Sequence, residues 1–212
     1  MRKAAWTAAL VVIAVFADGG AAMACDTTAH GALFVDAFDS LAATWGEASD
    51  ALNVSDGKLV MKPEANHTQW APNTAQSYRD VDLCAELTSV ASVDANNSFS
   101  GVMFWYIDDD NYYAFEIDAD GRASIWRRQR GRWLSQVDWV RAGALKPGDG
   151  STNELRVVIK GNVASYYLNG DLFREGMGVP PDNGQRVGVI ASSPKEGVAT
   201  YDFDDFTVRK PE

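Results

Sequence analysis

Histidine and cysteine are scarce in this chain of 212 residues, which contains two of each. Neither His30 nor His67 lies in a motif with metal-ligand spacing, so a histidine-based catalytic metal is not expected. The chain also lacks a glycine-rich phosphate loop, a Gly-x-Ser-x-Gly nucleophile motif and a Cys-x-x-Cys motif. We therefore expect no cofactor and assign no catalytic metal site.

Long apolar segments are also missing. The run Ala4–Ala17 is too short to span a membrane as a helix. Two basic residues precede it, and Ala22-Met23-Ala24 after it offers a small-x-small cleavage site, the pattern of a secretory signal peptide. We expect a leader over residues 1–24, a single domain over residues 25–212, and export to the periplasm or the medium.

The two cysteines, Cys25 and Cys84, allow two interpretations. In an oxidising compartment they would form a disulfide, which closes a loop worth on the order of 4 kcal/mol in the chain-entropy model. Cys25 would also be the first residue after cleavage and could carry a lipid. The Ala-Met-Ala sequence before it lacks the leucine usual in lipoprotein signals, so the disulfide is favoured.

Positive charge is in the minority, and the formal net charge is −10. Such an acidic chain is not expected to bind nucleic acid or an anionic membrane nonspecifically. The local exception is the segment 127–132, RRQRGR, flanked by Trp126 and Trp133. It is either a patch for an acidic glycan or a hairpin tip whose arginines balance nearby acids, and the second interpretation is preferred.

Short strand-forming segments fill the rest of the chain, divided by Gly, Asn and Pro, without a convincing amphipathic helix. This pattern predicts an all-β sandwich or barrel. The main expected strands are Leu33–Phe38, Lys58–Lys62, His67–Ala71, Asp80–Val90, Ser98–Ile107, Tyr112–Asp118, Arg122–Arg130, Trp133–Val140, Asn153–Lys160, Asn162–Leu168, Asp171–Arg174, Arg186–Ala191 and Val198–Val208.

The three strands from Ser98 to Arg130 are predicted to form a meander, because turn residues separate them at 108–111 and 118–121. The second turn places Phe115 opposite Ile125 on an apolar face. A four-residue first loop would place Phe104 opposite Phe115 and Trp105 on the other face. A slip of one residue would invert that strand.

The other face would then mix aromatic and charged side chains, which suits a sugar-binding surface: rings stack on sugar C–H faces, and polar groups bond the hydroxyls. The alternative is that the aromatic residues fill the core. The expected carbohydrate-binding residues are Trp105, Tyr112, Glu116, Trp126 and Arg128.

Several motifs carry a family resemblance in a fixed order: FVDAFD at 34–39, NYYAFEI at 111–117, DW at 138–139, NELRV at 153–157, LNG at 168–170, GV at 188–189 and FDDF at 203–206. Together they resemble the concanavalin A-like, laminin-G-like superfamily. This superfamily includes legume lectins, family 16 glycosidases and the 3-keto-disaccharide hydrolase-like domain. The resemblance implies a jelly-roll β-sandwich of two antiparallel sheets. It leaves function open, because lectins, enzymes and structural modules share that fold.

A possible catalytic motif is Glu116-x-Asp118-x-Asp120. Retaining glycosidases use two carboxylates about 5 Å apart, and family 16 enzymes carry a similar strand motif. Here the last acid is Asp rather than Glu, and it precedes Gly121 in a turn. An ordinary hairpin is therefore preferred. If the protein is an enzyme, Glu116 and Asp118 are the acids to test.

A structural calcium ion could be held by the acidic turn at 108–111, or by acids of the terminal strands if these strands pair. Asp and Asn are also ordinary turn formers. The terminal acids are Asp36, Asp39, Asp202, Asp204 and Asp205.

Three functions remain in order of preference. The first is an exported carbohydrate-binding, lectin-like domain without catalysis. The second is a glycoside-cleaving enzyme, and the third is a structural module of the cell envelope. The expected partner is a carbohydrate or polysaccharide.

Overall fold

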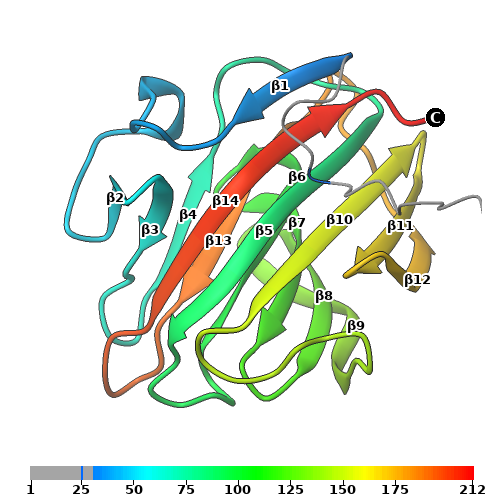
Figure 1. Ribbon diagram of the computed structural model, residues 1–212. Coiled ribbons are helices and arrows are strands. Elements are labelled where there is room, and N and C mark those ends of the chain that lie inside the picture. Colours follow the sequence, from blue (N-terminus) through cyan, green and yellow to red (C-terminus); the bar gives the residue numbers. More distant parts are fainter. Residues whose placement is uncertain (1–24, 26–30) are drawn as a thin grey trace, which may run out of the picture.

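The computed structural model describes Cys25 and residues 31–212, so the expected leader and His30 lie outside the described residues. Within these residues the strands form two antiparallel sheets packed face to face, which confirms the expected jelly-roll sandwich. In Figure 1, β14 (Thr200–Arg209) and β5 (Val81–Ala91) run side by side in one layer, and β13 (Arg186–Ser192), β6 (Phe99–Asp108) and β7 (Asn111–Asp118) lie behind them. No helix in this part of the chain is long and apolar enough to span a membrane.

The first sheet has eight strands within the described residues, and its seven-strand path begins at β12. β1 (Ala32–Asp36) lies off the path and pairs with β14, and a single 3-10 turn (Ala43–Trp45) follows it. The order along the path is β12 (Asp171–Met177), β11 (Val163–Leu168), β10 (Thr152–Lys160), β5 (Val81–Ala91), β14 (Thr200–Arg209), β3 (Lys58–Met61) and β2 (Leu52–Ser55).

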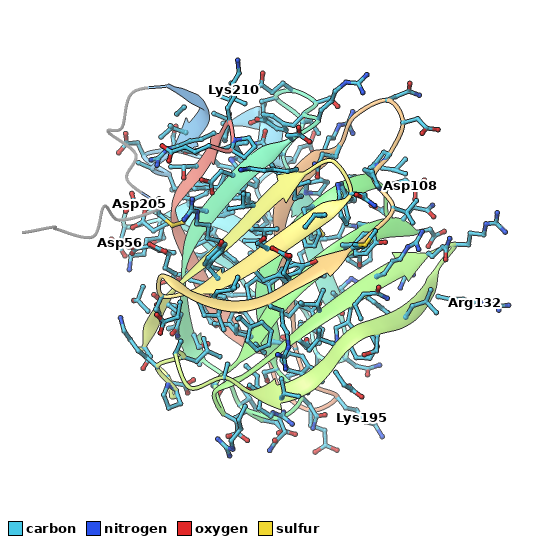
Figure 2. All side chains as sticks on the ribbon, turned by 90° about the vertical axis from the view of Figure 1, so that its right-hand side faces the viewer. Asp56, Asp108, Arg132, Lys195, Asp205 and Lys210 are labelled. Atoms are coloured by element: carbon cyan, nitrogen blue, oxygen red, sulfur yellow. A yellow bond between two sulfur atoms is a disulfide. The ribbon has the colours of Figure 1, made fainter. Side chains whose placement is uncertain are left out.

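The second sheet has six strands and contains the central meander. The turns before and after β8 are short, so Asp108 and Arg132 lie at the same end of this sheet, on the right in Figure 2. The strand order is β4 (Thr68–Pro72), β13 (Arg186–Ser192), β6 (Phe99–Asp108), β7 (Asn111–Asp118), β8 (Arg122–Gln129) and β9 (Arg132–Arg141).

The core lies between the two sheets, where alternate residues of each strand are buried. On β10 these are Leu155, Val157 and Ile159, and on β7 they include Phe115 and Ile117. The predicted apolar face of the meander is therefore confirmed as a core face.

Cys25 and Cys84 form the expected disulfide, with their Cα atoms 5.1 Å apart and a sequence separation of 59. The bond ties Cys25 to β5 in the middle of the first sheet. A loop of this length corresponds to about 4 kcal/mol of stabilisation in the chain-entropy model.

The second hairpin of the meander has the predicted register, with Phe115 opposite Ile125 and Ile117 opposite Ala123. Gly121 closes its turn with φ +82°, a left-handed conformation that glycine adopts without strain.

The prediction for the first hairpin was wrong. Asp108 pairs with Asn111, so the loop has two residues rather than four, and the Asp108 carboxylate accepts bonds from the Asp110 amide and the Asn111 side chain. This loop alone would still place Phe104 opposite Phe115, but the ladder shifts between Phe104 and Asp108, so Phe104 lies opposite Tyr113. The extra residues form a bulge in β6, where Trp105 has φ 47° and its side chain enters the core instead of the mixed face.

The buried side chain of Gln185 compensates for this bulge. Its Oε1 accepts a bond from the Trp105 amide at 2.6 Å, and its Nε2 donates to the Arg79 carbonyl at 2.8 Å. The amide that the bulge removes from the sheet ladder is thus bonded without water. Gln185 joins β6 to the segment before β5 and to the loop that precedes β13.

Replacing Gln185 with leucine should reduce the free energy of unfolding by about 2–4 kcal/mol, because each buried main-chain group left unpaired costs about 1–3 kcal/mol. Urea denaturation measures the loss. The matched control is Gln136→Leu on the exposed face of β9, with an expected change within about 0.5 kcal/mol. A loss below about 1 kcal/mol for Gln185→Leu would show that the bulge does not need this amide.

Candidate functional site

Four of the five expected sugar-binding residues lie on the outer face of the six-stranded sheet, as predicted. Tyr112 and Glu116 come from β7, and Trp126 and Arg128 come from β8. Tyr112 lies opposite Arg128. Because cross-strand partners share a face, these side chains belong to one surface.

The side chains on that surface are less exposed to solvent than the sequence suggested. Tyr112 is only 1% exposed and Glu116 only 2%. A small apolar cluster fills the middle of the face and packs against Trp70: Met103, Tyr106, Tyr112, Ala114 and Ile190. The expectation that this mixed face is open to solvent was therefore wrong at Tyr112 and Glu116, while Trp126 and Arg128 remain partly exposed.

Glu116 is a buried carboxyl group with an incomplete set of hydrogen bonds. The Ser124 hydroxyl donates to Oε2 at 3.3 Å, and Oε1 has no partner among the described residues. Burial disfavours the charged form and raises the pKa of Glu116 to about 8, although the Ser124 bond acts in the opposite direction. Near neutral pH this carboxyl is mostly protonated and can donate a proton.

Asp118, the second acid of the motif, is already engaged. Its carboxylate accepts the side-chain Nε of Arg122 at 2.6 Å and the Arg122 amide at 2.9 Å. Burial raises the pKa of Asp118, and the bonds from Arg122 lower it in part. Asp120 lies in the turn before Gly121, as predicted.

Trp105 lies in the inter-sheet core, 2% exposed, with its ring 4.9 Å from that of Tyr113. The loop after β12 passes directly over it. A Cβ on Gly178 would lie 1.9 Å from the Trp105 ring, so only glycine permits this approach. Next to Gly178, the Val179 amide donates to the Tyr113 hydroxyl at 3.1 Å.

Trp105 and the residues after Gly178 line a pocket of about 410 Å³, which we call the Arg127 pocket. It lies between the β6–β7 hairpin, β8 and the loop before β13. Its walls contain Trp105, Tyr112 and Arg128, and Glu116 and Trp126 are outside them. The complete lining is Trp105, Ile107, Asn111, Tyr112, Tyr113, Arg127, Arg128 and residues 179–184.

Three buried polar atoms in residues of this pocket have no partner among the described residues. They are the indole Nε1 of Trp105, the hydroxyl of Tyr112 and the Nε of Arg128. Burial, followed by the charge of Glu116, raises the pKa of Tyr112, so its hydroxyl remains a donor. Since buried donors are nearly always bonded, each of the three requires an acceptor that the described residues do not supply.

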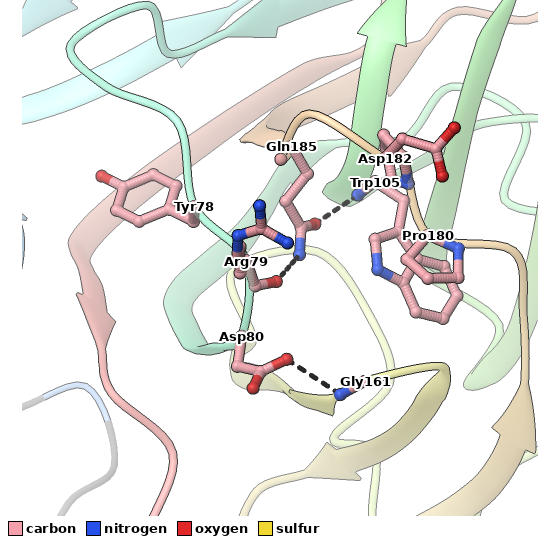
Figure 3. A pocket seen from close by; sticks show the side chains of 10 residues that line it. Tyr78, Arg79, Asp80, Trp105, Gly161, Pro180, Asp182 and Gln185 are labelled. Atoms are coloured by element: carbon pink, nitrogen blue, oxygen red, sulfur yellow. Dashed lines mark hydrogen bonds between the residues drawn. The ribbon is translucent and has the colours of Figure 1, made fainter.

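A second pocket of about 350 Å³, the Gln185 pocket, lies on the other side of the same loop. Figure 3 shows Trp105 and Pro180 beside Gln185, with Asp80 facing Gly161 below them. The Asp80 carboxylate accepts the Gly161 amide at 2.8 Å. Trp105 and Pro180 line both pockets, so the loop separates two recesses with a shared wall.

Sequence reasoning missed Arg127, Asn111 and the loop residues 179–184 as parts of a site. The segment 180–184, PPDNG, was visible as a turn, but its position beside Trp105 was not. Arg127 was considered only within the segment 127–132, either as a patch for an acidic glycan or as a hairpin tip, and the hairpin tip was preferred.

The acidic turn and the two terminal acids Asp36 and Asp204 are bonded within the protein: Asp108 closes its own turn, Asp36 accepts the Trp45 indole at 2.7 Å, and Asp204 accepts the amide after it. Within the described residues, the group with metal-ligand spacing is Cys25, Cys84 and Glu154, and its two sulfurs form the disulfide. His67 is exposed and stacks on Trp70. The structural calcium remains a prediction.

Replacing Glu116 with glutamine should stabilise the protein increasingly as the pH rises. The folded-state pKa of about 8 exceeds the ordinary value of 4.5, so between these values the folded protein holds a proton that the unfolded chain releases. The parent therefore loses up to about 1.4 kcal/mol per pH unit across this window and nothing further above it. Urea denaturation of both proteins between about pH 5 and pH 9 measures the difference. A difference that does not vary with pH would contradict the assignment of the buried acid.

Solved structures with this fold include both binding modules and enzymes. A carbohydrate-binding module, CBM66 from Bacillus subtilis, is 16% identical with a TM-score of 0.53, over 75% of this chain and 86% of that one. A Bacillus licheniformis beta-glucanase is 11% identical with a TM-score of 0.61, over 87% and 100%. A xylan beta-1,4-xylosidase from Bacillus halodurans C-125 is 14% identical with a TM-score of 0.60, over 83% of this chain and 39% of that one. At these identities the likeness shows the fold alone.

No curated protein matches the chain in sequence. Residues 33–209, nearly all of the described sandwich, match one protein family. The match agrees with the expected superfamily and with the two-sheet architecture. The chain belongs to the family of 3-keto-alpha-glucoside-1,2-lyase-like domains.

Proposed function

We propose that this protein is a carbohydrate-binding domain and that the Arg127 pocket is its binding site. The observation that carries the proposal is the coincidence of a pocket with three buried donors that have no partner among the described residues, on Trp105, Tyr112 and Arg128. A sugar hydroxyl is an acceptor of the right kind for each of them. The family's name and the CBM66 likeness support a saccharide as the ligand.

The rim of the pocket supplies apolar surface as well as polar groups. Ile107 is 57% exposed and Val179 60%, although both are large hydrophobic residues. On β9, Trp133 is 40% exposed and its ring meets that of Tyr112 edge-on. A sugar ring presents C–H groups on its faces and hydroxyls at its edge, so it matches a site with both kinds of surface.

Export is part of the proposal. A disulfide such as Cys25–Cys84 persists in an oxidising compartment and is rare in the cytosol. A binding domain with this bond would meet its saccharide in the periplasm or outside the cell.

A glycoside-cleaving enzyme is the second candidate, and the state of Glu116 favours it. A buried carboxyl group with a pKa of about 8 and one oxygen without a partner among the described residues has the protonation state that a proton donor to a leaving sugar oxygen needs, although Glu116 lies outside the Arg127 pocket. The family's name points to elimination across C1 and C2 of a 3-keto glucoside. That reaction breaks the C2–H and C1–O bonds and forms a C1=C2 double bond. Asp118 is the acid closest in sequence that could accept the C2 proton.

The variant Tyr112→Phe should change the affinity for the sugar without reducing the stability of the fold. The hydroxyl has no partner among the described residues, so its removal should leave the thermal unfolding temperature unchanged or slightly higher. Loss of one hydrogen bond to the sugar should weaken affinity roughly 2- to 12-fold. A glycan array identifies the best ligand, and calorimetry compares the two proteins.

The matched control is Tyr201→Phe. The Tyr201 hydroxyl donates to the Ser192 carbonyl at 3.1 Å. Ser192 is the last residue of β13, whereas the pocket lies before its first residue, Arg186, so this variant should lose stability and keep the affinity of the parent for the sugar. Equal affinity of the parent and a folded Tyr112→Phe would place binding elsewhere. No binding to any glycan would instead favour a structural module of the envelope.

For the second candidate, Glu116→Gln should lower the rate of cleavage of a 3-keto glucoside by about 100-fold or more, because proton transfer contributes about 10²–10⁴-fold. The assay follows release of the aglycone by the parent, Glu116→Gln and Asp118→Asn. Absence of turnover by the parent, or full activity of both variants, would remove this candidate.

A further inference from the structure

We infer that the saccharide held in the Arg127 pocket carries a carboxylate, as a uronic acid does, and that the guanidinium of Arg127 binds it. This inference rests on the proposed function and narrows its ligand class. It concerns the charge of the sugar, which neither the family's name nor the structural likenesses specify.

Arg127 is a cation that forms no ion pair with the described residues. The ion pairs there involve Arg122, Arg128 and Arg156, each with an aspartate. Other described arginines without an ion pair, such as Arg130, Arg132 and Arg186, are exposed to solvent. Arg127 is only partly exposed, so water solvates its charge incompletely.

Contacts in the pocket hold this guanidinium in place without neutralising it. Its central carbon lies 5.3 Å from the centre of the Tyr113 ring, in a cation–π contact. The Tyr113 hydroxyl accepts the Val179 amide, so the ring is fixed between β8 and the loop. A pre-positioned planar guanidinium with free N–H groups is the side chain best suited to bind a carboxylate with two hydrogen bonds.

Arg128 also lines the pocket, although its side chain points to the opposite face of β8, and its positive charge is only weakly paired. Its nearest acid is Asp110 at 3.3 Å, and the Asp110 side chain is 63% exposed. An exposed ion pair contributes little, so a ligand carboxylate can replace it at low cost. The Arg128 Nε remains an unbonded buried donor. Asp182 on the loop is the acid in the pocket lining, and it is exposed to solvent.

The test compares acidic oligosaccharides with the neutral oligosaccharides obtained by reducing their carboxyl groups. Uronate oligosaccharides from pectin, alginate and glucuronoxylan, each beside its carboxyl-reduced form, are titrated into the protein by calorimetry. At least one acidic form should bind, and the affinity for its carboxyl-reduced form should be lower by about tenfold or more. The reason is that a hydrogen bond to a charged group is about twice as strong as a neutral one, and two such bonds are lost on reduction.

The affinity of the Arg127→Gln variant for the acidic form should fall by the same factor, so that this variant binds the acidic and the carboxyl-reduced forms equally. The matched control is Arg132→Gln, which removes one charge from the same hairpin. Arg132 is exposed, projects away from the sheet in Figure 2 and does not line the pocket. The affinity of the Arg132→Gln variant for the acidic oligosaccharide should therefore equal that of the parent. Thermal unfolding checks that each variant is folded.

The outcomes separate the two proposals. Equal binding of acidic and reduced forms, or equal losses for Arg127→Gln and Arg132→Gln, would overturn the carboxylate inference. Carbohydrate binding itself would then stand, provided that Tyr112→Phe weakens it. No binding of any acidic or neutral glycan would overturn both. Parallel loss in both arginine variants that disappears at about 0.5 M salt would indicate nonspecific charge attraction and would also contradict the inference.

Discussion

The position of Trp105, and of the loop beside it, depends on the buried side-chain amide of Gln185. The bulge in β6 removes the Trp105 amide from the sheet ladder, and Gln185 Oε1 bonds it instead. With Trp105 turned into the core, Gly178 can pass over its ring and the loop can approach Arg127. One hydrogen bond at a strand irregularity thus shapes both pockets, which share Trp105 as a wall.

Local turn chemistry decided which parts of the fold the sequence could predict. The second hairpin ends in Asp-Gly, and Gly121 with positive φ fixed its register as expected. The first hairpin offers three aspartates and an asparagine, and the Asp108 carboxylate accepts two bonds that close a two-residue loop, but the register changes only at the bulge beyond it. The bulge that follows depends on Gln185, about 80 residues away in sequence. Local propensity carries no information about such a contact.

For the candidate site, alternation along the strands placed Tyr112, Glu116, Trp126 and Arg128 on one face correctly. Alternation does not report burial: Tyr112 belongs to an apolar cluster with residues of β6 and β13, and Glu116 is also buried. Arg127 faces the other way from Arg128, so pattern reasoning assigned it to no surface. It joins the pocket because the loop after β12 folds over the end of the sheet, a tertiary event without a local signal.

The most direct test of the account is the indole N–H signal of Trp105 in nuclear magnetic resonance spectra, followed while the best-bound saccharide is added. The account predicts a saturable shift of the Trp105 signal. The Trp45 indole, which donates to Asp36 at 2.7 Å in the core, should stay unchanged. An unmoved Trp105 signal, with shifts confined to Trp126 or Trp139, would place the saccharide on the outer face of the sheet and contradict the assignment of the Arg127 pocket.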